Sequence, residues 1–398
     1  MYKSYKVADN FYWVGAIDWN LRDFHGYTTE KGSSYNAFLL MDEKVTLFDT
    51  VKSHFAEEML ERIKDKVEPS KIDYIVVNHV EMDHSGALAK VVDIIKPEKI
   101  ICSAKGKEAM IAHFKRTDWP YHVVKTGDTL SLGKNSLTFI ETPMLHWPDS
   151  MFSYINEQRI LISSDAFGQH WGTSERFDDE VDFGELIFQA GKYFANILMP
   201  YSNLIQKLLK DVTALGIKID LIAPDHGLMW RKNIPAIIKA YDEWSKPVLK
   251  NKAVVVFDTM WKSTELMAQQ VAEGLISKGV VVKLMKLGEN DRSDVMTEIL
   301  DSKIVVVGSS TLNNEMLPRV ADMTTYMKGL KPVGRIGACV NSYGWNPNII
   351  KKVNAELEAG GIKIVDEGIA VKYVPEKTDL EKCFELGVKL ADALQKKL

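Results

Sequence analysis

The stretch NHVEMDHSG, residues 78–86, follows the strand-like run IDYIVV at residues 72–77 and precedes the helix-like run ALAKVVDII at residues 87–95. Alternation along an extended chain places side chains 79, 81 and 83 on one face, and residue 84 can reach that face from the turn. Imidazole and carboxylate groups gathered in this way are typical of a metal site. The predicted ligands of this stretch are His79, Glu81, Asp83 and His84. The alternative is a charged surface loop.

Three more candidate ligands come at the ends of later strand-like runs. His146 follows SLTFIETPML (136–145), Asp165 lies in RILISSDAF (159–167), and His226 lies in LIAPDHG (221–227). Each alone could be a capping aspartate or a buried, hydrogen-bonded histidine. Together with the first four they would suffice for two metals that share one bridging carboxylate. We expect residues 1–250 to form an α/β domain, an αββα sandwich whose loops gather at the strand ends.

The last part of the chain has a different pattern. Strand-like runs alternate there with helix-like stretches, which predicts a parallel sheet with helices on both faces, a flavodoxin-like doubly wound domain at residues 251–398. The four runs are AVVVF (253–257), VVVKLM (280–285), KIVVVG (303–308) and RIGACV (335–340). All nine histidines precede residue 230, and Pro247 precedes the first run, which supports a boundary near residue 250.

Three loops of this second domain should lie together, because the carboxyl ends of parallel strands meet at one edge of a sheet. The first, DTMWKST (258–264), puts hydroxyls and backbone N–H groups at a helix start and suits a monophosphate rather than a dinucleotide or triphosphate. The other two loops, which follow the third and fourth strand-like runs, offer amides and aromatic rings. The three loops together predict a binding site for FMN. The expected contacts are Thr259, Met260, Trp261, Ser263, Thr264, Ser309, Thr311, Leu312, Asn313, Ser342, Tyr343, Gly344 and Trp345.

Charge and cysteine usage narrow the function classes. The 50 Lys and Arg against 54 Asp and Glu give a formal charge of −4, which argues against nucleic-acid binding. No run of apolar residues is long enough for a membrane span or a signal peptide, so we expect a cytoplasmic protein. The three cysteines are far apart, which disfavours a disulfide framework, a thiolate zinc site and an appended rubredoxin-type module.

These motifs and their order resemble the flavodiiron proteins (A-type flavoproteins), over essentially the whole chain. Members of that family fuse a metallo-β-lactamase-like domain to a flavodoxin-like domain and reduce O2 to water or NO to N2O. The resemblance is carried by H-x-E-x-D-H (79–84), LHWPD (145–149), Asp165, His226, DTMW (258–261) and SYGW (342–345). It implies an oxidoreductase with two iron ions and FMN.

The resemblance also implies roles for single residues. One iron would be held by His79, Glu81, His146 and Asp165, and the other by Asp83, His84, His226 and the shared Asp165. His25 and Tyr193 resemble the residues that line the substrate pocket of the family. A head-to-tail homodimer, or a dimer of such dimers, would bring the FMN of one chain beside the iron site of the other. Electrons would come from rubredoxin or from a reduced F420-type cofactor.

Two other functions fit parts of the pattern. The chain could be a zinc-dependent hydrolase with a flavodoxin-like domain, but hydrolytic zinc members of the superfamily carry His where this chain has Glu81. A carboxylate there adds charge and a hard donor, which favours iron. The chain could also be an electron carrier without catalysis, which the complete ligand set argues against.

The chain departs from the family pattern at three places. Asn346-Pro347-Asn348 stands where a small, Gly-rich run is usual, so flavin contacts or redox potential could differ. Asp225 precedes His226 where Ser is common, and would add a negative charge. Phe194 replaces a frequent second Tyr, which leaves Tyr193 as the phenol of that segment.

Overall fold

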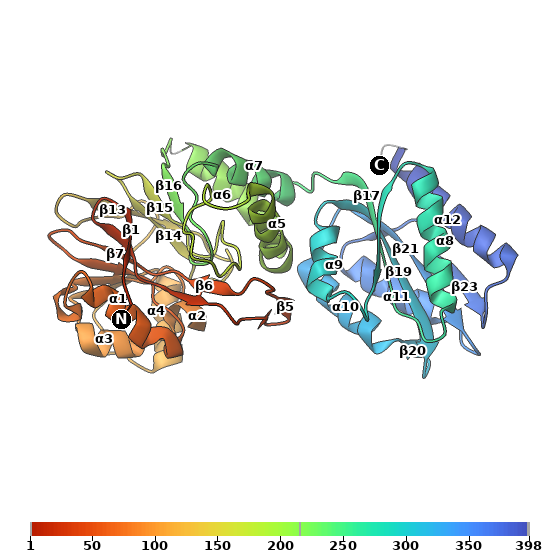
Figure 1. Ribbon diagram of the computed structural model, residues 1–398, viewed down its shortest axis with the longest axis horizontal. Coiled ribbons are helices and arrows are strands. Elements are labelled where there is room, and N and C mark those ends of the chain that lie inside the picture. Colours follow the sequence, from red (N-terminus) through yellow and green to blue (C-terminus); the bar gives the residue numbers. More distant parts are fainter. Residues whose placement is uncertain (1, 215, 396–398) are drawn as a thin grey trace. The chain divides into compact units, whose positions relative to one another are not determined.

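The computed structural model describes residues 2–214 and 216–395 of the chain (Figure 1). Contacts divide it into two compact units. The first comprises the chain up to Phe24, Thr29–Tyr193 and Asn203–Asp242, and the second comprises His25–Thr28, Phe194–Ser202 and the chain from Glu243 onward. The predicted domain boundary at residue 250 stays a prediction. No helix among the described residues is both long enough and apolar enough to cross a membrane.

The first unit contains two main sheets. One has the order β1-β2-β7-β8-β9-β10-β11, and the other has the order β12-β13-β14-β15-β16. The strands of the first are β1 (Tyr5–Ala8), β2 (Phe11–Trp13), β7 (Phe38–Leu40), β8 (Thr46–Phe48), β9 (Tyr74–Val76), β10 (Lys99–Cys102) and β11 (Tyr121–Val123). Those of the second are β12 (Thr129–Ser131), β13 (Ser136–Glu141), β14 (Met151–Ile155), β15 (Ile160–Ile162) and β16 (Leu221–Ala223). A short pair, β3 (Ala16–Asp18) with β6 (Ser33–Tyr35), also belongs to this unit, and β4 (Asp23–Phe24) pairs with β5 (Tyr27–Thr28), which contacts assign to the second unit.

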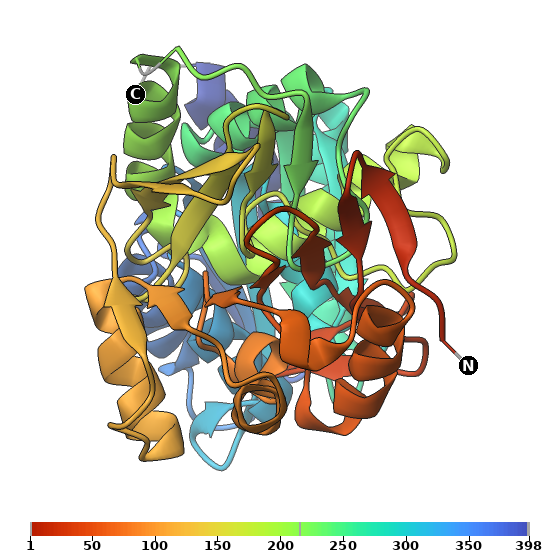
Figure 2. The ribbon, with the colours of Figure 1, turned by 90° about the vertical axis from the view of Figure 1, so that its left-hand side faces the viewer.

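Helices form the outer layers of this unit. Figure 2 shows the orange helices and the green helices on opposite sides of the strands. They are α1 (Ala56–Lys64), α3 (Leu88–Ile95) and α4 (Ala104–Phe114) on one side, and α5 (Phe183–Tyr193), α6 (Ser202–Ala214) and α7 (Ile234–Ser245) on the other. In α3 the buried side chains recur at helical spacing, at Leu88, Val91, Val92 and Ile95, because that face packs on the sheet.

Two apolar clusters mark the layers. One joins the first sheet to its helices, for example through Leu39, Met59 and Val91. The other fills the space between the two sheets, for example with Phe48 and Phe139. The unit is therefore an αββα sandwich, as the sequence predicts.

The second unit is built on a parallel sheet with the order β18-β17-β19-β21-β22, and β23 also pairs with β21. This is the 2-1-3-4-5 order of flavodoxin-like folds, and it confirms the predicted fold class. The strands are β17 (Lys250–Phe257), β18 (Val281–Lys286), β19 (Ser302–Leu312), β21 (Ile336–Tyr343), β22 (Lys363–Ile364) and β23 (Ile369–Lys372), and β20 (Glu315–Met316) forms a hairpin with β19.

Helices cover both faces of this sheet. In Figure 1, α8 and α12 lie on one face, and α9 and α10 lie on the other. The bounds are α8 (Ser263–Ser277), α9 (Arg292–Ile299), α10 (Pro318–Leu330), α11 (Ile349–Ala359) and α12 (Lys377–Gln395). The register pairs Phe257 with Gly308 and Ser310 with Ser342, so the carboxyl ends of β17, β19 and β21 meet at one edge.

Candidate metal centre and cofactor pocket

The seven predicted metal ligands follow strand ends of the first unit. His79 follows β9, and α2 (Met82–Ser85) carries Asp83 and His84. His146 lies in the loop after β13, and Asp165 and His226 follow the parallel strands β15 and β16. The folding of two sheets against each other thus brings together residues that are far apart in the sequence.

The ligand atoms form two groups around Asp165. His146 Nε2 lies 3.0 Å and His79 Nε2 lies 3.4 Å from Asp165 Oδ2. On the other side, His84 Nε2 lies 3.1 Å and His226 Nε2 lies 3.4 Å from Asp165 Oδ1. Each oxygen of one carboxylate therefore faces a different pair of imidazoles, which is the arrangement of a bridging ligand.

Each group is completed by one further carboxylate. Glu81 Oε2 lies 3.1 Å from His146 Nε2 and 3.3 Å from His79 Nε2. Asp83 Oδ2 lies 3.2 Å from His226 Nε2 and 3.3 Å from His84 Nε2. The two sets, His79, Glu81, His146 and Asp165 on one side and Asp83, His84 and His226 on the other, each place one donor atom per residue within 4.8 Å of one another.

The imidazoles are oriented by groups behind them. His79 Nδ1 lies 3.0 Å from Asp149 Oδ2, which also accepts the N–H of Val80. His226 Nδ1 donates to the carbonyl of Ser34 at 2.8 Å. A ligating histidine usually makes such a bond through its other ring nitrogen, which turns Nε2 toward the metal. Asp149 and Ser34 therefore fix the orientation of two of the four imidazole rings.

The ionisation of the cluster matches a cation site. Burial by itself would raise the pKa of Asp165, but the charge of His84 and a hydrogen bond from His146 hold it well below its ordinary value. Burial would lower the pKa of His79, yet its hydrogen bonds to Asp149 and Glu81 raise it well above the ordinary value. Asp165 thus stays ionised while His79 binds a proton, which a metal ion would displace.

Several buried atoms of the cluster lack a well-aligned hydrogen bond within the described part of the chain. They are both carboxylate oxygens of Asp83, Oδ1 of Asp165 and both ring nitrogens of His84. A buried polar atom without a partner costs about 1–3 kcal/mol. Donor atoms left in this state fit a metal pair, because coordination would satisfy them.

Asp225 lies beside the second ligand set. Its carboxyl group is fully buried, and Oδ2 lies 3.9 Å from His84 Nδ1. Burial, together with the charges of Asp49 and Asp165, raises the pKa of this carboxyl group well above the ordinary value. The effect of Asp225 on the metal centre stays a prediction.

One neighbour of the cluster was missed by the sequence analysis. His170 is buried, and its ring centroid lies 4.7 Å from that of His226 and 5.2 Å from that of Tyr193. Burial and the charge of His226 hold its pKa well below the ordinary value, so the ring is neutral. His170 does not follow a strand directly, and its only signal was its position shortly after Asp165 in the chain.

The two predicted pocket residues fall in different units. Tyr193, the last residue of α5, is buried, and its ring lies 5.9 Å from that of His226. His25 is exposed, has φ of +56°, and belongs to the segment His25–Thr28 of the second unit. Its predicted role stays a prediction.

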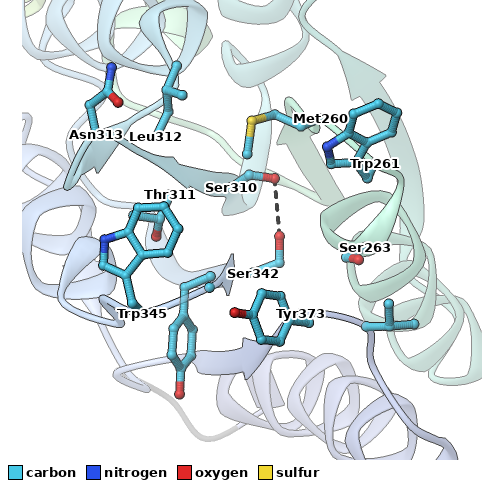
Figure 3. Close-up of a pocket in the computed structure, with 13 residues that line it drawn as sticks. Met260, Trp261, Ser263, Ser310, Thr311, Leu312, Asn313, Ser342, Trp345 and Tyr373 are labelled. Carbon is cyan, nitrogen blue, oxygen red and sulfur yellow. Dashed lines mark hydrogen bonds between the residues drawn. The ribbon is translucent and has the colours of Figure 1, made fainter.

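The second unit holds a cavity of about 470 Å³ at the carboxyl edge of its sheet (Figure 3). Loops after β17, β19 and β21 line it, as the sequence predicts for FMN. The predicted residues among the lining are Met260, Trp261, Ser263, Thr311, Leu312, Asn313, Ser342, Tyr343, Gly344 and Trp345. Three lining residues were not predicted, namely Ser310, Tyr373 and Val374.

The remaining predicted contacts do not line this cavity. Ser309 faces away from it and accepts the N–H of Leu317, because alternate side chains of β19 point to opposite sides. Thr264 is buried behind the cavity, where its hydroxyl bonds those of Ser310 and Ser342 at 2.9 and 2.8 Å. Thr259 is likewise absent from the lining, and its hydroxyl is buried.

The cavity suits FMN by size and by chemistry. Ligand pockets of cofactor size have volumes of roughly 300–1,000 Å³. The amino end of α8, which begins at Ser263, offers backbone N–H groups for a phosphate. Trp261, Trp345 and Tyr373 offer aromatic faces for an isoalloxazine ring.

The loop after β23 was overlooked for a physical reason. Tyr373 has φ of +60°, and its N–H donates to the carbonyl of Tyr343 at 2.7 Å. Its ring then stands 3.3 Å from where a Cβ on Gly344 would lie. The strand β23 is short and has no long apolar run. The sequence pattern therefore predicts no strand there, and no cofactor loop after it.

Known families and proteins match this chain along its length. Residues 34–227 match the family described as ODP family beta lactamase, and residues 255–387 match the flavodoxin family. A protein named nitric oxide reductase, from Moorella thermoacetica, is 47% identical over 97% of each chain.

Solved structures are similar over the whole fold. The rubredoxin oxygen:oxidoreductase from Desulfovibrio gigas is 43% identical, with a TM-score of 0.97 over 99% of each chain. The flavodiiron protein from Giardia intestinalis is 35% identical, with a TM-score of 0.95 over 98% of this chain and 97% of that one. Both units, and their order along the chain, are therefore shared with these proteins.

Proposed function

Because this chain belongs to the flavodiiron protein family, we propose that it reduces O2 or NO, using electrons that pass through FMN to two iron ions. The observation that carries this proposal is Asp165, whose two oxygens each face a different pair of imidazoles. One carboxylate between two complete donor sets is what a pair of metal ions requires.

Each of the two ligand sets would hold one iron ion. His79, Glu81, His146 and Asp165 hold the first, and Asp83, His84, His226 and Asp165 hold the second. Glu81 occupies the position where hydrolytic zinc members carry His, and its hard oxygen donor favours iron. Three carboxylates surround the pair, so their charge offsets most of the charge of two ferrous ions.

The bound groups supply the electrons: two from the iron pair and two from reduced FMN, enough to reduce O2 to water, while two NO need only two. The chain supplies the surroundings. Asp149 and the carbonyl of Ser34 hold His79 and His226 in orientation. Tyr193 keeps its proton, because burial and the charge of Asp165 raise the pKa of its phenol well above the ordinary value. The phenol is thus a hydrogen-bond donor beside the second ligand set.

The donor and the assembly are further parts of the proposal. A relative named rubredoxin oxygen:oxidoreductase matches over 99% of each chain, which supports rubredoxin as the external donor, with a reduced F420-type cofactor as the other source. We propose a head-to-tail homodimer, in which FMN of one chain serves the iron site of the other. The three buried, unpaired cysteines support a reducing compartment such as the cytoplasm.

The test is anaerobic. Iron, zinc and FMN are quantified per chain, the protein is fully reduced, and the flavin spectrum is followed after addition of O2 or of NO. We expect two iron ions and one FMN, with rapid flavin reoxidation. Water without peroxide identifies an O2 reductase, and N2O from NO identifies an NO reductase. Zinc at two per chain without flavin would refute the proposal in favour of the hydrolase.

A further inference from the structure

We propose that Asn346 fastens two cofactor loops together and slows the release of FMN. The inference rests on the assignment of the cavity to FMN under the proposed function. The loops are those that follow β19 and β21, and Asn346 lies in the Asn346-Pro347-Asn348 segment where this chain departs from its family.

Three polar groups of Asn346 make hydrogen bonds. Its carbonyl accepts from Thr311 Oγ1 at 3.1 Å, and its side-chain Nδ2 donates to Asn314 Oδ1 at 3.1 Å. Its Oδ1 accepts the N–H of Asn348 at 3.0 Å. The first two bonds cross from the loop after β21 to the hairpin of β19 and β20, and the third braces the loop itself.

Both ends of this connection are anchored. Thr311 Oγ1, which donates to Asn346, also accepts from Asn341 Nδ2 of β21 at 3.1 Å. At the other end, Lys352 Nζ donates to the carbonyl of Asn314 at 3.1 Å and pairs with Glu315. Consecutive hydrogen bonds reinforce one another, so the two loops should move as one body.

The connection lies where it can control the cofactor. Thr311, Leu312 and Asn313 line the cavity from the hairpin of β19 and β20, and Trp345, beside Asn346, lines it from the loop after β21 (Figure 3). Trp345 is 79% exposed, so little packing from this chain holds its ring in place. The hydrogen bonds of Asn346 keep the loop that carries Trp345 opposite the hairpin. Without them, the two sides of the cavity could move apart.

Asn314 allows a clean test of the bond. Its φ is +61°, a conformation that glycine adopts without strain, so Asn314→Gly removes the side-chain acceptor while the turn can keep its conformation. Asn314→Asp keeps an oxygen that can accept from Asn346. Asn346→Ala removes the donor and the brace to Asn348. Asn348→Ala is the matched control, because Asn348 takes part through its backbone N–H and not its side chain.

The experiment measures the rate of FMN release from the holoprotein by the recovery of free-flavin fluorescence, with the flavin midpoint potential, iron content and thermal unfolding alongside. We expect Asn346→Ala and Asn314→Gly to release FMN about three- to ten-fold faster, in line with the net strength of one or two hydrogen bonds. Asn314→Asp and Asn348→Ala should resemble the wild type, and iron and unfolding should not change.

The outcomes separate the two proposals. A wild-type protein that binds no FMN would overturn the proposed function and this inference with it. Wild-type binding with unchanged release from both Asn346→Ala and Asn314→Gly would overturn only the role of Asn346. Faster release from Asn314→Asp as well would show that the hairpin turn, rather than this hydrogen bond, matters, and would also overturn it.

Discussion

Asp165 lies between the two proposed ligand sets, and His146 belongs to the more exposed of them. The side chain of His146 is 16% exposed, whereas those of His79 and His84 are fully buried. Its Nε2 contacts both Glu81 and Asp165. His146 is therefore the ligand whose loss should disturb the surrounding fold least.

We expect His146→Asn to lose at least one iron ion per chain and the reductase activity, while FMN stays bound. The physical reason is that the amide is shorter and lacks an imidazole nitrogen, whereas the flavin cavity belongs to a separate unit. Metal analysis and flavin absorbance check it. His122→Asn, an exposed histidine of β11, is the control. Full oxidase activity in His146→Asn would remove this residue from the ligand set.

Tyr193 places a protonated phenol ring 5.9 Å from the ring of His226. We expect Tyr193→Phe to keep iron and FMN and to react with O2 or NO about ten-fold or more slowly, because a positioned hydrogen-bond donor is lost. Single-turnover reoxidation of the reduced protein checks it, and the solvent isotope effect should also change. Reoxidation at the wild-type rate would leave Tyr193 as a packing residue.

Two helices of the flavodoxin-like unit cross at glycines. An added Cβ on Gly274 of α8 would lie 2.1 Å from the carbonyl oxygen of Phe384 in α12. One on Gly387 of α12 would lie 2.2 Å from the carbonyl oxygen of Val271 in α8. The backbones are therefore in direct contact, and both positions require glycine for space rather than for an unusual φ.

We expect Gly274→Ala to destabilise this unit by about 1–3 kcal/mol, because the methyl group forces the helices apart. Gly329→Ala in α10 is the matched control, since nothing lies within 4 Å of its added Cβ. That change should stabilise by about 0.5–1 kcal/mol through higher helix propensity. Denaturant unfolding followed by flavin fluorescence checks both. Equal stability of the two variants would contradict the close crossing.

The two cofactor sites lie in two different compact units, so each can be removed without the other. This separation makes the proposed dimer testable with mixed proteins. His146→Asn lacks a complete iron site and keeps FMN. Ser263→Trp should fill the cavity at the start of α8, lose FMN and keep iron.

The two inactive variants are mixed, dissociated from their dimers and reassociated. We expect the mixture to recover about a quarter of the wild-type rate. Half of the dimers contain one chain of each variant, and each such dimer has one of its two pairs of FMN and iron site complete. Steady-state reduction of O2 or NO checks it. Each variant alone, treated in the same way, is the control. A mixture that stays inactive would mean that the two cofactors work within one chain.

Much of what the sequence predicted follows from the spacing of residues that are close together in the chain. The stretch at residues 78–86 joins a strand to a helix and carries four predicted donors, and the later predicted ligands lie in the loops after strands, so their location at one end of the sandwich follows from the pattern of alternation. The strand before His146 ends earlier than the sequence run suggests, at Glu141. The same holds for the loops after β17, β19 and β21, because a parallel sheet must gather them at one edge. The periodicity of apolar residues and the positions of turns depend on residues that are close together in the chain. The sequence alone therefore determines them.

The tertiary structure decided what depends on residues far apart in the chain. It placed Asp165, which the family resemblance names as the shared carboxylate, between imidazoles that follow β9, β13 and β16. It buried Asp225 and His170, and this burial raises the pKa of Asp225 and lowers that of His170. It also turned Ser310 rather than Ser309 toward the flavin cavity and added Tyr373. Burial, register and long-range contact set these properties, and no local pattern encodes them.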